Sequence, residues 1–226
     1  KPTVRINRKN YKYHIKGVPP ICLDEVSKMA DELGDSEVKT DWEVWGRFLE
    51  DPELYKKSEA APPVSRIRKK MTDGLSKVEQ VKEVRVEVAK NYCKVFVIAE
   101  DEKVRWRIIK HPKEINDAVV EMLSSWDMDD RVNKSNATRG AARLAILDHE
   151  GCREYDFSGY FDQFPLSEEV SHFFVFFDGK RYYAPLRLLM GASFSVSVAT
   201  AATRVLTKGI EKGLSVTISH QIDNVR

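Results

Sequence analysis

The chain has 226 residues, of which 42% are hydrophobic and 32% are charged, and its formal net charge is +2. These values are those of an ordinary soluble globular protein, and no apolar run is long enough to cross a bilayer or to act as a signal peptide. The three cysteines, Cys22, Cys93 and Cys152, are odd in number and far apart, so they match neither a disulfide framework nor a zinc motif. We therefore expect reduced thiols in an intracellular protein, nuclear or cytoplasmic, with no membrane contact.

Residues 1–60 are predicted to form a basic arm followed by helices. Residues 1–16 carry no acidic side chain and six basic ones, Lys1, Arg5, Arg8, Lys9, Lys12 and Lys16. Such an arm suits a polyanionic partner, although a solvated, disordered tail explains it equally well. A first helix is expected from Asp24, as its cap, to Leu33, with Gly34 as its stop. A second helix at 41–49 carries an aromatic stripe that we expect to pack in the core, namely Trp42, Trp45, Phe48 and Leu49.

A basic segment follows the break at Ala60-Ala61-Pro62-Pro63. It is expected to be helical from Ser65 up to Gly74. Its cationic side chains could contact a nucleic-acid backbone; they are Arg66, Arg68, Lys69 and Lys70. Taken alone, such a run is more often a solvated face.

A β-hairpin is expected next, from a strand at 94–99, a polar turn at 100–103 and a return strand at 104–110. Along the return strand Arg105 and Arg107 alternate with apolar residues, so both point to one face. Two guanidinium groups on one face can grip a polyphosphate. The alternative is an exposed polar sheet face.

Helices are then expected at about 114–126 and 138–147, with a polar loop between them. The second helix leads into a short strand that ends at Asp156. After a short turn or helix at 167–171, Asp178-Gly179 between two aromatic runs predicts a hairpin.

The last elements bring a second carboxylate to the end of a strand. A run rich in Ala, Val, Ser and Thr at 194–212 predicts a buried helix ended by Gly213. A strand at 215–221 then leads to Asp223. Two carboxylates from different strands are what a two-metal nucleotidyl-transfer site requires, so Asp156 and Asp223 are predicted Mg²⁺ ligands.

Four stretches of the chain, taken in order, resemble motifs of reverse transcriptases. Asp156-Phe157-Ser158-Gly159-Tyr160-Phe161-Asp162-Gln163-Phe164-Pro165-Leu166 resembles their first catalytic motif, an Asp followed five residues later by an aromatic residue and then by Pro-Leu. Leu188-Leu189-Met190-Gly191 resembles the Leu-Pro-Gln-Gly type motif, and Gln221-Ile222-Asp223-Asn224 takes the place of Tyr-x-Asp-Asp. The stretch 103–116 resembles the fingers hairpin, with a basic residue, Trp and Arg followed by Glu, a hydrophobic residue and Asn. The resemblance covers about 94–226 and is to retrotransposon enzymes, with the tyrosine-recombinase lineage (DIRS, Ngaro, VIPER) as the candidate branch.

The resemblance implies an α+β fold with the fingers and palm of a polymerase right hand. The antiparallel palm sheet would be flanked by helices, and the chain would be truncated before the thumb. Residues 61–150 would form a fingers-like subdomain and 151–226 a partial palm with the catalytic carboxylates. The implied activity is that of an RNA-directed DNA polymerase, which uses deoxynucleoside triphosphates, an RNA or DNA template-primer and Mg²⁺ (or Mn²⁺).

The resemblance also implies roles for individual residues. Asp156 and Asp223 would be catalytic and would hold the metal together with the carbonyl oxygen of Phe157. Phe161 would lie under the incoming sugar and exclude a 2′-hydroxyl. The remaining nucleotide contacts would come from Arg107, assisted by Arg105 or Lys103, and from the pocket floor at Met190 and Gly191.

Several positions depart from the family pattern. Asn224 replaces the second Asp of the last motif, Gln221 the usual Tyr, Leu189 the usual Pro and Met190 the usual polar residue. Glu100 and Asp101 lie where the family often has a lysine. These departures favour a second interpretation, a catalytically decayed reverse-transcriptase-like module that binds nucleic acid or protein. An unrelated α+β domain with incidental carboxylates is a third.

Overall fold

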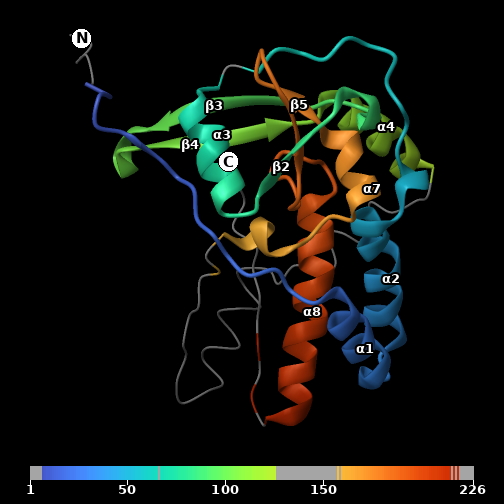
Figure 1. Cartoon of the computed structure of the whole chain (residues 1–226). Coiled ribbons are helices and arrows are strands. Elements are labelled where there is room, and N and C mark those ends of the chain that lie inside the picture. The colour runs from blue at the N-terminus through green and yellow to red at the C-terminus, as the bar shows by residue number, and fades with distance from the viewer. Residues whose placement is uncertain are drawn as a thin grey trace, which may run out of the picture.

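The computed structural model describes residues 7–65, 67–125, 157, 159–214, 216 and 218. Across these ranges helices are mixed with two small three-stranded sheets (Figure 1). The predicted helix at 138–147 and the strand before Asp156 lie outside the described residues, as does most of the predicted strand at 215–221. Among the helices that are described, none is both long and apolar enough to cross a membrane.

The first sheet contains the predicted hairpin. Strands β3 (Lys94–Glu100) and β4 (Arg105–His111) pair antiparallel, from Lys94 opposite His111 to Glu100 opposite Arg105. The turn between them is the 3-10 helix η3 (Asp101–Lys103). These elements confirm the hairpin prediction. A third strand, β1 (Lys12–Tyr13), comes from the N-terminal arm and pairs parallel with β4.

The second sheet is antiparallel in the order β2 (Val81–Val84), β6 (Tyr182–Pro185), β5 (Phe176–Phe177). The Asp178-Gly179 turn joins β5 to β6, as predicted. The Asp178 carboxylate accepts hydrogen bonds from the backbone of Lys180 and Arg181, both at 2.8 Å, and Gly179 has a φ of 97°. The first strand of this hairpin, β5, is shorter than expected because the preceding aromatic residues belong to the 3-10 helix η5 (His172–Phe174).

Three helices pack side by side, α1 (Leu23–Leu33), α2 (Ser36–Glu50) and α8 (Ser195–Gly213) (Figure 1). Gly34 ends α1 with a φ of 73°, as predicted, but Asp24 is not the cap. The cap position is Cys22, and Asp24 lies in the first helical turn. Helix α2 begins earlier than expected because Asp35 caps it and accepts hydrogen bonds from two backbone amides.

The basic helix α3 (Lys69–Lys77) begins later than predicted and continues through Gly74. Ser65 cannot join the helix because its amide donates to the carbonyl of Phe177 at 2.8 Å and its hydroxyl accepts from the amide of Val95 at 3.0 Å. Gly74 lies inside the helix, and Ile15 of the arm packs there, 2.8 Å from where a Cβ would lie.

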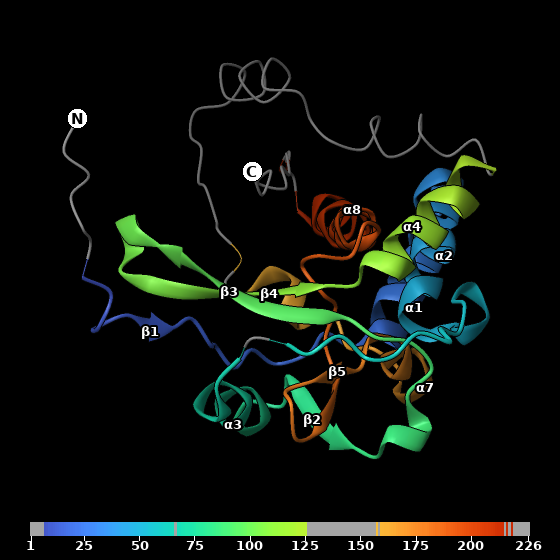
Figure 2. The same cartoon turned by 90° about the horizontal axis from the view of Figure 1, so that it is seen from above.

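The other helical segments of the described residues are shorter than α2 and α8. They are η1 (Pro52–Leu54), η2 (Val86–Val88), α4 (Lys113–Ser124), η4 (Tyr160–Gln163) and α7 (Glu168–Ser171). Helices α4 and α7 confirm the predicted ones. Seen from above, α4 and α8 lie on one side of the β3–β4 hairpin, and α3 and the second sheet lie on the other (Figure 2).

The hydrophobic core is centred on aromatic rings. Phe48 is fully buried and stacks on Phe194 with ring centroids 4.7 Å apart, and Tyr55 packs against both rings. The predicted core stripe of α2 is confirmed, since its members are all buried: Trp42, Trp45, Phe48 and Leu49. The three segments predicted from the sequence, 1–60, 61–150 and 151–226, each contribute residues to this core.

Candidate functional site

One face of the β3–β4 hairpin carries two arginines with a carboxylate between them. Glu100 accepts a hydrogen bond from Nε of Arg105 and another, of 3.3 Å, from Nη1 of Arg107. The two arginines therefore share a face, as predicted. Their side chains are 25% and 23% exposed, and that of Glu100 is 18% exposed. The hydrogen bond from Arg105 lowers the pKa of Glu100, so the carboxylate stays charged.

Arg107 also reaches a turn that is distant in the sequence. Its Nη2 lies 2.6 Å from Sδ of Met190, in the turn that follows β6. The hairpin and the Leu188–Gly191 motif therefore meet in space. A thioether sulfur is only a weak acceptor, so Met190 holds the guanidinium less firmly than an amide oxygen would.

Asn116 of α4 fastens the same turn to the hairpin. Its Nδ2 donates to the carbonyl of Gly191 at 2.9 Å, and its Oδ1 accepts from the amide of Ser193 at 2.9 Å. A Cβ on Gly191 would lie 2.1 Å from the carbonyl oxygen of Lys110, so only glycine allows this approach to β4. Sequence reasoning placed Asn116 in a motif but gave it no role.

The Lys110 side chain is buried, and its charge is influenced by that of Asp162 in η4, which is half-buried. Lys110 is 7% exposed, and burial lowers the pKa of its ammonium group although Asp162 opposes this. Burial likewise raises the pKa of Asp162 against the attraction of Lys110. Each charge thus offsets part of the unfavourable desolvation of the other.

The N-terminal arm is docked on the hairpin tip from its first described residues. Both Nε and Nη2 of Arg8 donate to the Asp101 carboxylate at 2.9 Å, and the hydroxyl of Tyr11 donates to the same carboxylate at 2.9 Å. The Tyr11 ring packs against Trp106. From Asn7 onward the arm is therefore not the solvated tail that the charge pattern also allowed, and Arg8 is engaged within the chain.

His14 connects the arm directly to the arginine face. Its amide donates to the carbonyl of Trp106 at 2.9 Å, and its Nδ1 lies 3.0 Å from Nη1 of Arg105. A guanidinium can only donate, so this contact requires Nδ1 to be an acceptor and the ring to be neutral. Contacts therefore run without a break from His14 through Arg105, Glu100 and Arg107 to Met190.

The predicted sugar-contacting ring lies in the core. Phe161, in η4, is 6% exposed and packs against Tyr160. The Tyr160 hydroxyl donates to the carbonyl of Ala199 at 2.7 Å, which fixes η4 on α8. Phe157 is 52% exposed and stacks on Tyr160, with ring centroids 5.4 Å apart. The sugar-selecting role of Phe161 stays a prediction.

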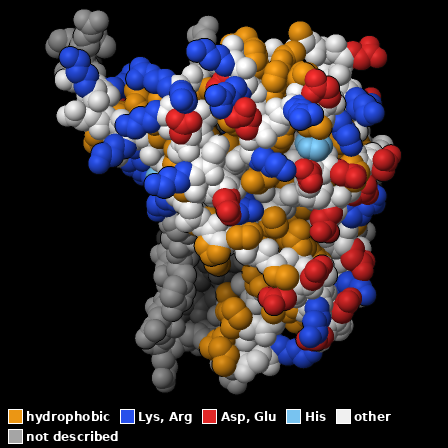
Figure 3. All heavy atoms as spheres, viewed as in Figure 1, with side chains coloured by type: hydrophobic (Ala, Val, Ile, Leu, Met, Phe, Trp, Pro, Cys, Tyr) orange, Lys and Arg blue, Asp and Glu red, His pale blue; other side chains and the backbone are white. Residues whose placement is uncertain are grey.

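The other predicted site residues lie apart from this centre or outside the described ranges. Lys103 is exposed in η3, and three cationic residues are exposed at the start of α3: Arg68, Lys69 and Lys70. Lys and Arg side chains gather where the arm, the hairpin tip and α3 come together (Figure 3). Asp156, Asp223 and Arg66 lie outside the described residues. In the part of the chain that is described, no group of three His, Cys, Asp or Glu side chains could hold a metal ion.

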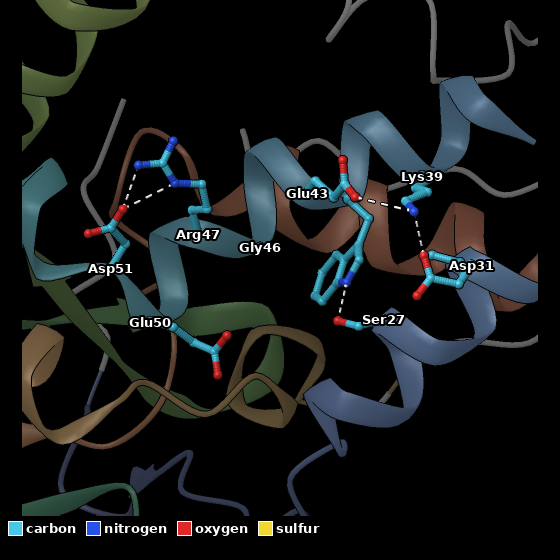
Figure 4. Close-up of a pocket in the computed structure, with 10 residues that line it drawn as sticks. Ser27, Asp31, Lys39, Glu43, Gly46, Arg47, Glu50 and Asp51 are labelled. Atoms are coloured by element: carbon cyan, nitrogen blue, oxygen red, sulfur yellow. Dashed lines mark hydrogen bonds and ion pairs between the residues drawn. The ribbon is translucent and has the colours of Figure 1, made fainter.

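A hollow of about 310 Å³ lies elsewhere, between α1 and α2 (Figure 4). Within it, Trp42 Nε1 donates to the Ser27 hydroxyl at 2.9 Å, and Lys39 bridges Asp31 at 2.7 Å and Glu43 at 3.7 Å. Its charged groups thus largely satisfy one another across the two helices, and no predicted site residue lines it.

Comparison with known proteins finds only distant structural likeness. No family model matches the chain, and no curated protein matches it. Solved structures of the prototype foamy virus protease-reverse transcriptase are similar to it at 15% identity. The native structure gives a TM-score of 0.44, with 92% of this chain and 30% of that chain covered. The complex with an RNA/DNA hybrid gives a TM-score of 0.43, with 92% of this chain and 31% of that chain covered. The dRH complex with double-stranded DNA gives a TM-score of 0.44, with 87% of this chain and 37% of that chain covered. This chain thus spans about a third of their length, and a likeness at this level says nothing about activity.

Replacing Asn116 by Ala removes both hydrogen bonds to the Gly191 turn. We expect the free energy of unfolding to fall by about 1–3 kcal/mol and the Ser193 amide to exchange faster with deuterium. Asn116→Asp is the matched variant, because it keeps an acceptor for Ser193 and loses the donor to Gly191. It should retain most of the Ser193 protection. Unchanged Ser193 exchange in the Ala variant would contradict the anchoring role.

Docking of the arm is expected to weaken in mild acid. Burial, followed by the charges of Arg105 and Lys16, lowers the pKa of His14, whereas Glu100 and Asp162 act in the opposite direction. The docked arm therefore binds the proton less readily than a released arm. Docking is at full strength above the ordinary histidine pKa of about 6.5 and is lost progressively as the pH falls from there to the lowered value.

This pH dependence can be measured by hydrogen exchange as the protection of the backbone amide of residue 14, corrected for the intrinsic effect of pH on exchange. His14→Gln keeps a side-chain acceptor that does not titrate, so its protection should stay level over the same range. Equal loss of protection in both proteins would assign the effect to another group.

Proposed function

We propose that this chain carries the nucleotide-binding part of an RNA-directed DNA polymerase, with a fingers hairpin at β3–β4 and a partial palm that begins near residue 151. The observation that carries the proposal is the contact between Arg107 and Met190, together with the Asn116 clamp on Gly191. Residues that were assigned to one nucleotide pocket from separate motifs converge around one junction. An incidental resemblance of short motifs gives no reason for such convergence.

The arginine face has the chemistry to grip a triphosphate. Arg105 and Arg107 come from one strand, point to one face and are each about a quarter exposed. Planar guanidinium groups bind phosphate oxygens through paired hydrogen bonds. Lys103, exposed in η3, can add a further charge at the tip. The Met190-Gly191 turn would form the floor beneath the base.

The catalytic part of the proposal rests on Asp156 and Asp223, with the carbonyl oxygen of Phe157 as a further ligand. Oxygen ligands of this kind suit Mg²⁺ or Mn²⁺. When bound, such ions activate the primer 3′-hydroxyl and stabilise the leaving pyrophosphate. Asn224 in place of a carboxylate lowers the negative charge available for this task. Phe161 would favour deoxynucleotides, and the retrotransposon lineage is part of the same proposal.

The template-primer would be bound by cationic side chains at the start of α3. Arg68, Lys69 and Lys70 are exposed, and phosphate contacts of this type supply most of the non-specific affinity for nucleic acid. Arg66 comes shortly before them in the sequence and would belong to the same basic segment.

A second candidate function is a decayed reverse-transcriptase-like module that binds nucleic acid or protein without catalysis. The occupation of the arginine face by Glu100 favours it, since a phosphate must compete with a carboxylate that is already in place. The weak acceptor at Met190 and the replacement of a carboxylate by Asn224 also favour this second candidate. Polymerase activity separates the two candidates.

The full-length protein is expected to extend a primer on an RNA template in the presence of Mg²⁺. Asp156→Asn and Asp223→Asn should each abolish extension while template-primer affinity stays within about twofold, because each removes one metal-ligand charge. Extension assays with binding measured in parallel test this. Absence of extension by the unaltered protein, with template-primer still bound, would favour the decayed module.

Nucleic-acid binding should depend on salt through the α3 cations. The combined variant Arg68→Gln, Lys69→Gln, Lys70→Gln should bind a duplex more weakly, and the slope of log affinity against log salt should fall by about 0.9 for each phosphate that the protein no longer neutralises. The matched control replaces three exposed lysines elsewhere, Lys28, Lys56 and Lys57, by Gln. An equal change of slope in the control would remove α3 from the binding surface.

A further inference from the structure

We propose that Glu100 is a built-in occupant of the arginine face, so that an oligophosphate binds Arg105 and Arg107 only by displacing its carboxylate. The inference deepens the proposed function and rests on it for the identity of the ligand. It makes Glu100 an autoinhibitory element of the nucleotide site.

The position of Glu100 follows from the register of the hairpin. Glu100 lies directly opposite Arg105 in the β3–β4 pairing, and Arg107 lies two residues further along the same face. Each carboxylate oxygen takes one guanidinium, Oε2 that of Arg105 and Oε1 that of Arg107. A carboxylate that bridges two guanidinium groups uses the same hydrogen-bond donors that a phosphate would use.

The arginines have further contacts that do not depend on Glu100. Nη1 of Arg105 contacts His14 of the arm, and Nη2 of Arg107 contacts Met190. When the Glu100 side chain turns away, these contacts still hold both guanidinium groups in place. Exchange of the carboxylate for a phosphate therefore requires little reordering of the arginines.

The Glu100 side chain is placed to leave. It is the last residue of β3, next to η3 at the tip, and 18% of its side chain is exposed. A ligand binds only the fraction of molecules in which the carboxylate has turned away, so its apparent affinity is reduced by that fraction. Glu100 therefore lowers the affinity of the arginine face for every phosphate ligand that needs both guanidinium groups.

The test uses inorganic tripolyphosphate and isothermal titration calorimetry on the intact protein at fixed ionic strength. Glu100→Gln retains an acceptor oxygen for the hairpin and removes the charge. We expect it to bind tripolyphosphate at least about tenfold more tightly, which is the scale of a competing charge-assisted hydrogen bond.

The matched control is Glu102→Gln, which removes the same charge from an exposed position in the same turn. It should change the affinity by less than about twofold, because an exposed charge is largely screened by solvent. Equal tightening in the two variants would overturn the inference, because general charge would then explain it. Failure of both the unaltered protein and Glu100→Gln to bind tripolyphosphate would also overturn it.

A double variant shows where the gain arises. Adding Arg107→Gln to Glu100→Gln should abolish the gain in affinity, and persistence of the gain would overturn the inference. Tighter tripolyphosphate binding without primer extension by the full-length protein would retain the inference and reject the polymerase. Primer extension by the full-length protein, with a KM for deoxynucleotides that is unchanged in Glu100→Gln, would support the polymerase and reject the inference.

Discussion

The close approach of Gly191 to the backbone of β4 is the constraint on which the candidate site depends. A Cβ there would lie 2.1 Å from the carbonyl oxygen of Lys110, so any other residue would push the turn away from the hairpin. Asn116 fixes the approach from the side of α4 by satisfying one carbonyl and one amide of the turn. Met190 precedes Gly191 and is thereby brought to Arg107.

Charge pairing at the hairpin tip gives the two acidic residues different partners. Glu100 bridges the arginines of its own hairpin, whereas Asp101 receives Arg8 and Tyr11 from the arm. The acidic tip that sets this chain apart from the reverse-transcriptase pattern therefore has two structural uses. One neutralises part of the arginine face, and the other recruits the arm as a third strand. These exposed and half-exposed pairs contribute modestly to stability, so their main effect is on where the cationic groups are held.

The same features bear on both candidate functions. A polymerase needs arginines that are held in place yet accessible, and the contacts to His14 and Met190 hold them from two sides. A decayed binding module needs no access for a nucleotide, and a carboxylate could then remain between the arginines without cost. The hairpin geometry is common to both. What separates them is how readily Glu100 leaves, and whether Asp156 and Asp223 form a metal site.

Much of the local structure could be read from the sequence, because it depends on neighbours within a few residues. The alternation at 104–110 predicted the shared face of Arg105 and Arg107, Asp178-Gly179 predicted a tight turn, and Gly34 predicted the end of α1. The helical spacing of the aromatic residues in α2 predicted their burial. Periodicity and turn chemistry act over short distances, so these features needed no knowledge of the rest of the fold.

Only the tertiary structure decided which distant groups met. The late start of α3 followed from the bonds of Ser65 to two strands, and Ile15 of the arm packs against Gly74 within that helix. The docking of Arg8 and the role of Asn116 each join residues that are far apart in the chain. The bridging by Glu100 joins neighbours within one hairpin and follows from the register of β3 against β4. By itself the sequence determined which residues carry charge and which face of a strand they occupy. Their partners were decided by packing between elements, because a charged side chain pairs with whatever the fold brings within reach.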